Sequence, residues 1–85
     1  MKLPLIKHIN QFIEENDQDF IEEAITVLEH ISESKGLKDE ELDVIGELLS
    51  NLYGAIEVNN MIKSGKEERT ALNEFMQRVL GSIDQ

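Results

Sequence analysis

The chain has 85 residues and a formal net charge of −10, with 18 acidic side chains against 8 basic ones. This length favours a single domain over residues 1–85, and an apolar fraction of 40% is too high for a disordered acidic tail. The absence of cysteine excludes disulfides and thiolate metal sites, and the negative charge argues against nucleic acid or an anionic membrane surface as a partner.

The sequence also favours a cytoplasmic location. No apolar run approaches the roughly 20 residues that a membrane span needs, and the first residues lack the pattern of a secretory signal. A composition without cysteine is compatible with a reducing compartment.

Apolar residues recur at helical spacing along the chain, and no strand pattern is present. Four amphipathic helices are predicted, at about residues 4–15, 17–34, 39–63 and 65–83. Asp17 is placed to cap the second helix, and Gly36 to follow its end. Ser64 and Glu67 have the spacing of a capping box that would start the fourth helix. The short connections predict a mostly antiparallel, all-α bundle of four helices.

The third predicted helix is the longest and is expected to be central. Its main apolar stripe consists of Leu42, Ile45, Leu48, Leu49, Leu52, Tyr53 and Ile56. A second, weaker stripe lies roughly opposite and consists of Val44, Ala55, Val58 and Ile62. This second stripe needs a neighbouring helix or a second subunit to cover it. A homodimer is one way to do so, because a small domain gains core by association.

Three small residues, Gly46, Ser50 and Gly54, follow one another every four residues on the third helix. Glycine inside a helix costs about 1 kcal/mol relative to alanine, so two on one track suggest a packing reason. That reason is close packing against a helix of the same bundle, a subunit contact or a peptide groove. The candidate protein-binding residues are therefore Val44, Gly46, Ser50, Gly54, Ala55 and Val58.

The negative charge is concentrated in residues 14–47, which hold thirteen acids and two bases, a net charge of −11. In the second helix, Glu22, Glu29 and Glu33 are predicted to line the side away from the apolar stripe. They form a candidate acidic docking face for a basic partner. The alternative interpretation is a solvated face, with many of the acids placed where helix N-termini favour negative charge.

No catalytic, cofactor-binding or metal-binding residues are predicted. Asp17 and Asp19 have the spacing of two calcium ligands, but the glycine and glutamate of an EF-hand loop do not follow. His8 and His30 lack a nucleophile in a recognisable arrangement and are interpreted as surface residues. Tyr53, with Asn59 and Asn60 further along, indicates either a small polar pocket or the wet end of a helix, and the second is favoured.

Several stretches carry a resemblance that extends from end to end. They are the Met1-Lys2-Leu3-Pro4 opening, residues 37–48 (LKDEELDVIGEL), residues 53–58 (YGAIEV) and residues 78–82 (RVLGS). Through these stretches the chain is similar to an uncharacterised family of short, acidic, all-helical bacterial proteins. Since that family has no assigned activity, the resemblance implies no catalytic residue.

We therefore expect a non-enzymatic helical protein-interaction module that requires no cofactor and binds another protein, with self-association as one form of that role. The alternative is an acidic inhibitor or anti-nuclease protein that docks on a basic partner through its carboxylates. An enzyme would need a pocket with convergent polar groups, and the sequence shows no such set.

Overall fold

The protein is described by a computed structural model that covers residues 2–83, with side chains to residue 80. Its helices are α1 (Leu3–Glu15), α2 (Gln18–Ser32), α3 (Asp39–Lys63) and α4 (Glu68–Ile83). The described range contains no strand. The all-α class with four helices, predicted from the apolar spacing, is therefore confirmed.

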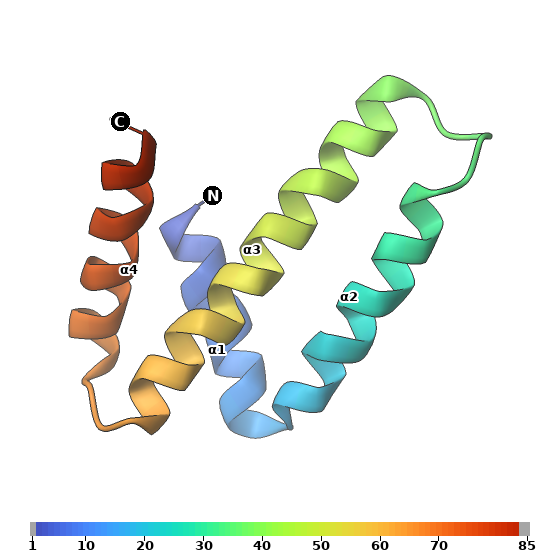
Figure 1. The fold of residues 1–85 in the computed structure, drawn as a ribbon. Helices are drawn as coiled ribbons and strands as arrows, with labels where there is room; N and C mark the ends of the chain where they lie inside the picture. Colours follow the sequence, from blue (N-terminus) through green and yellow to red (C-terminus); the bar gives the residue numbers. More distant parts are fainter. Residues whose placement is uncertain (1, 84–85) are drawn as a thin grey trace.

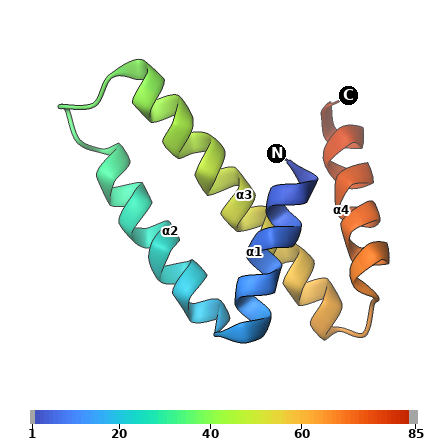
Figure 2. The same ribbon diagram turned by 180° about the vertical axis from the view of Figure 1, so that it is seen from behind.

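Helix α3 is the longest element and organises the molecule. It contacts each of the other three helices, whereas α2 and α4 lie on either side of it and make no contact with each other. Figure 1 shows α1 crossing behind α3, and Figure 2, seen from behind, shows it in front. The molecule measures 43 × 35 × 17 Å, so it is one to two helices thick. The predicted central position of the third helix is confirmed.

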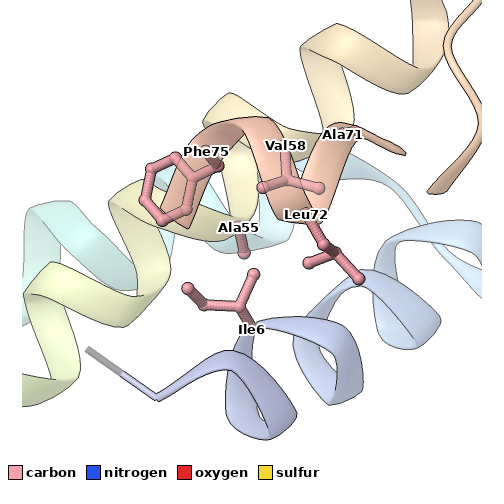
Figure 3. Close-up of a cluster of buried hydrophobic side chains, with 6 residues drawn as sticks. All are labelled: Ile6, Ala55, Val58, Ala71, Leu72 and Phe75. Carbon is pink, nitrogen blue, oxygen red and sulfur yellow. The ribbon is translucent and has the colours of Figure 1, made fainter. Parts of the chain in front are cut away.

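Two apolar clusters hold the helices together, and α1 contributes to both. The larger joins α1, α3 and α4 through Ile6, Ala55, Val58, Ala71, Leu72 and Phe75 (Figure 3). The smaller joins α1 to α2 through Ile13, Ile21 and Ile25, with half-buried leucines and isoleucine of α3 packed against them. Through these two clusters the short helix α1 packs against each of the other three helices.

The start of α2 is capped as expected, but its end is not. The side chain of Asp17 accepts a hydrogen bond of 3.1 Å from the backbone N–H of Asp19. The prediction that Gly36 follows the helix end was wrong, because α2 already ends at Ser32 and Gly36 does not have the positive φ that a glycine in this position usually adopts. The backbone at Glu33 is still right-handed, and the helix unwinds through a turn.

The predicted capping box of α4 is also wrong, because Ser64 belongs to the end of α3 and only Glu67 stands directly before α4. The hydroxyl of Ser64 donates back to the carbonyl of Met61, 2.7 Å away. Gly65 takes a φ of 111°, and the N–H groups of Gly65 and Lys66 donate to the carbonyls of Ile62 and Met61. This is the Schellman arrangement that ends a helix with glycine. Consequently α4 starts at residue 68, three residues later than predicted.

Candidate functional site

One apolar stripe of α3 changes from exposed to buried along the helix. Its members lie three or four residues apart and so share a face: Val44, Leu48, Asn51, Ala55 and Val58. The last three are 0% exposed, because the start of α1 packs on Asn51 and because Ile6 of α1, together with side chains of α4, packs against Ala55 and Val58. Val44 is 58% exposed and Leu48 41% exposed. The second stripe is therefore covered by α1 together with α4, and only in its C-terminal half.

Two contacts of Lys2 mark the place where α1 begins on α3. Its backbone N–H donates to Oδ1 of Asn51 at 2.9 Å, and its ammonium lies 3.7 Å from a carboxylate oxygen of Glu47. At 1.5 Å per residue, the 13 residues of α1 span about 20 Å and the 25 residues of α3 about 38 Å. Helix α1 is therefore too short to cover all of α3. Helices α2 and α3 form a hairpin, and Figure 2 shows no helix over the half of this hairpin that lies nearest its connecting loop.

Helix α2 adds a second apolar stripe on the side of the hairpin where α1 packs. Phe20, Ala24, Val27 and Ile31 follow one another at three- and four-residue spacing. Phe20 and Ala24 line a cleft of about 680 Å³ together with Phe12 of α1. The rings of Phe12 and Phe20 meet edge to face, with centroids 5.9 Å apart. Since Val27 and Ile31 continue this stripe toward the hairpin tip, they lie on the same side as α1 and beyond its reach.

The two stripes and Phe12 form one surface, which we call the uncovered face. Its exposed large apolar side chains are Phe12, Phe20, Val27, Ile31, Val44 and Leu48. In the described part of the chain, the other exposed large apolar side chains are Tyr53 and Leu80. Single exposed apolar residues are ordinary on a soluble protein, but a gathering of them on one side marks an interaction surface. The uncovered face is therefore the candidate functional site.

The predicted acidic docking face lies on the opposite side of the same hairpin. Val27 and Glu29 are two residues apart, which turns their side chains about 200° from each other. Glu22, Glu29 and Glu33 are all exposed. The hydroxyl of Tyr53 donates to Oε2 of Glu29 at 2.7 Å, and this hydrogen bond, with smaller effects of desolvation and of the carboxylate charge, raises the pKa of Tyr53 above its ordinary value. Glu22, Glu29 and Glu33 thus form an exposed row, which we call the acidic row, and Tyr53 of α3 lies at its border.

The candidate protein-binding residues on α3 do not form one surface. Ala55 and Val58 are buried in the larger apolar cluster, and Val44 is exposed on the uncovered face. Ser50 and Gly54 line an opening of about 460 Å³ between α3 and α4, where Gly54 is buried and Ser50 exposed.

Gly46 stands apart from the rest of the small-residue track. A side chain added there would meet nothing within 4 Å. Close packing between helices of the same bundle therefore does not explain Gly46.

Sequence reasoning missed three asparagines that are buried among the helices. Asn10 and Asn51 are fully buried, and Asn59, favoured above as the wet end of a helix, is nearly so. Asn59 donates to Oε1 of Gln18 at 2.6 Å. The amide nitrogen of Asn10 donates to the carbonyl of Ile6, but its oxygen has no partner among the described residues. Asn10 is four residues from Ile6 and three from Ile13, so its place on the apolar stripe was the signal available.

Within residues 2–83, no three acidic or histidine side chains come together in a way that could hold a metal ion. None of the described helices combines the length and the hydropathy needed to cross a membrane. The histidines stand apart: His8 lines the α1–α2 cleft, and His30 lines a separate hollow near the end of α2.

The geometry therefore defines a small all-α bundle with one partly covered central hairpin. The chain belongs to a family of unknown function, DUF6952, whose sequence profile matches residues 1–84. The expected membership in an uncharacterised family is confirmed by this match. A search of curated proteins and a search of solved structures found no significant match to the chain.

Proposed function

We propose that the protein is a non-enzymatic protein-interaction module that binds its partner through the uncovered face. The observation that carries this proposal is that, of the eight exposed large apolar side chains among the described residues, six gather on one side of the α2–α3 hairpin. Burial of apolar surface stabilises an association by roughly 25 cal/mol per Å² before the costs of association are subtracted. A partner that covers these residues would therefore gain a substantial apolar contact.

The position of these residues supports the same proposal. Helix α1 covers the hairpin up to Asn51 and leaves Leu48 and Val44, the next residues of the stripe, in solvent. This apolar stripe is therefore buried by neighbouring helices in one half and exposed to solvent in the other half. A partner element beside α1 would complete that cover.

Affinity capture from the native host tests the proposal when it is run on matched variants. Leu48→Gln removes an apolar side chain from the uncovered face, and Leu80→Gln removes one of similar exposure from α4. We expect proteins captured by the wild type to be lost with Leu48→Gln and retained with Leu80→Gln, as quantified by mass spectrometry. Equal capture by both variants would refute the proposal.

The acidic row supports a second candidate function, an inhibitor that docks on a basic partner such as a nuclease. Of the thirteen acids in residues 14–47, Glu47 is the one that forms an ion pair within the described residues. Replacing Glu22, Glu29 and Glu33 together by glutamine separates the two candidates. Loss of the captured proteins in this triple variant, with retention in Leu48→Gln, would favour the inhibitor.

We also propose that the protein is cytoplasmic and of bacterial origin. The composition without cysteine and the resemblance described above support this proposal. Fractionation of native cells, with detection of the protein in each fraction, tests the location.

A further inference from the structure

We infer that the uncovered face takes a basic amphipathic helix of another protein. This inference rests on the proposed function and names the chemistry of the partner. Three observations carry it: the way α1 already packs on the hairpin, the carboxylates that line the hollows of the uncovered face, and the scarcity of cations that could neutralise them.

The shape of the site favours a helix. Helix α1 lies across α3 and buries Ile6, Asn10 and Ile13, which are spaced at four and three residues, so the hairpin already accepts one helix on this side. From Asp39 to Leu48 the uncovered part of α3 spans about 15 Å, or roughly three helical turns. An amphipathic helix of that length presents apolar anchors at positions i, i+3 or i+4, and i+7.

The charge of the site favours a basic helix. Two hollows of the uncovered face hold a carboxylate beside apolar residues: Glu15 beside Phe12 and Phe20, and Glu40 beside Val44. Neither of these two carboxylates forms an ion pair or a side-chain hydrogen bond with another described residue. Lysine or arginine at the flanks of a bound helix would meet them.

The same charge disfavours a second copy of this chain as the occupant. Residues 14–47 carry a net charge of −11, and their two bases, Lys35 and Lys38, lie in the loop at the hairpin tip. Two copies joined through their uncovered faces would bring two such segments together. Like charges held close at an interface destabilise it, whereas a basic partner is attracted from a distance.

Fluorescence anisotropy with two synthetic peptides tests the inference. Each peptide has about 14 residues, enough for roughly four turns, with leucines at helical spacing. One carries lysines on its flanks, and the other carries glutamates at the same positions. We expect the lysine peptide to bind at least tenfold more tightly than the glutamate peptide, with an affinity that falls as salt is added.

Matched variants locate the bound peptide. Leu48→Gln and the double variant Glu15→Gln/Glu40→Gln should each weaken the lysine peptide by about tenfold. Leu80→Gln and the double variant Glu67→Gln/Glu68→Gln, which changes the net charge by the same amount elsewhere, should leave its affinity unchanged. Circular dichroism of each variant verifies that the helices are retained.

Other outcomes would overturn the inference in distinguishable ways. Equal affinity for both peptides, lost in Leu48→Gln, would retain the docking face but refute its selection of charge. Binding that resists Leu48→Gln and is lost when Glu22, Glu29 and Glu33 are neutralised would place the peptide on the acidic row. Sedimentation that shows a dimer of the wild type, abolished by Leu48→Gln, would make a second copy the occupant.

Discussion

The backbone N–H of Lys2 donates a hydrogen bond of 2.9 Å to the side-chain oxygen of Asn51, 49 residues further along the chain. Asn51 also donates from its amide nitrogen to the carbonyl of Glu47, 2.8 Å away. One fully buried side chain therefore holds the start of α1 in register on α3. It also sets the boundary between the covered and uncovered parts of the hairpin.

Replacing Asn51 by alanine should destabilise the fold by about 1–3 kcal/mol, because a part-buried N–H loses its acceptor and a small cavity forms. Asn60, an exposed residue on the same helix, provides the matched control. Asn60→Ala should change the free energy of unfolding by less than about 0.5 kcal/mol. Urea denaturation followed by circular dichroism measures both values, and equal values would contradict this role of Asn51.

Replacing Asn10 by leucine should stabilise the protein by about 1–2 kcal/mol. The side-chain oxygen of Asn10 is buried without a partner, so it lost its hydration on folding and gained nothing in return. For a domain of this size, such a gain raises the melting temperature by roughly 4–8 °C per kcal/mol.

The control for Asn10 is Asn16, which makes the same bond from its amide nitrogen to a carbonyl four residues earlier but is exposed. Because water hydrates its side-chain oxygen, Asn16→Leu should give no gain. A melting temperature that falls in Asn10→Leu would show that the polar group fixes the packing of α1.

The apolar spacing was sufficient to predict four helices, and in α3 it located both ends of the helix, Asp39 and Lys63. It could not predict how deeply each stripe of α3 is buried. Leu49 and Leu52, on the main stripe, are half-buried, whereas Ala55 and Val58, on the weaker one, are fully buried. Spacing defines which residues share a face, but burial depends on where α1 crosses, and that crossing results from contacts far apart in the sequence.

The same limit applies to the candidate site. Val44 was predicted as a binding residue, and it is part of the uncovered face. Four other members, Phe12, Phe20, Ile31 and Leu48, lie on apolar stripes whose spacing predicts core positions, and Val27 lies on the flank of such a stripe. Val27, Ile31, Val44 and Leu48 are exposed because α1 does not extend over the half of the hairpin nearest its tip. A helix length of 13 residues could be predicted, but its placement against Asn51 could not.

Because one stripe of α3 is buried at Val58 and exposed at Val44, replacing valine by alanine should destabilise the protein at the first position and hardly at the second. Val58→Ala removes two buried carbons and leaves a cavity in the larger cluster, so it should cost about 2 kcal/mol. Val44→Ala, on the same stripe in solvent, should change stability by less than about 0.5 kcal/mol. Thermal unfolding of the two variants measures the contrast, and similar losses would mean that Val44 is covered in solution.

The contact between Tyr53 and Glu29 predicts a shift that absorbance can follow. The chain has one tyrosine and no tryptophan, so the phenolate signal reports Tyr53 alone. Its pKa is raised above 10.0 chiefly because its hydroxyl donates to Glu29. The stability from this bond is therefore fully present below pH 10.0 and is lost as the pH rises through the raised pKa.

In Glu29→Gln the pKa of Tyr53 should fall toward 10.0, the ordinary value for tyrosine. Glu22→Gln removes a carboxylate from the same row without touching Tyr53 and should leave the pKa unchanged. An absorbance titration compares the three proteins. Identical titration curves would exclude the hydrogen bond in solution.

Gly46, inside α3, and Gly65, just beyond its C-terminal end, predict opposite signs for the same substitution. Gly46 lies inside the helix with open space where a methyl group would be, so Gly46→Ala should stabilise the protein by about 1 kcal/mol. Gly65 ends the helix at a φ of 111°, which side chains rarely adopt, so Gly65→Ala should destabilise it by about 1–2 kcal/mol. Denaturation midpoints measure both.

If Gly46→Ala is more stable and yet captures less partner protein from the host, the glycine is kept for a partner that approaches the helix closely. If it is more stable and captures the same proteins, the small-residue track is not a binding site.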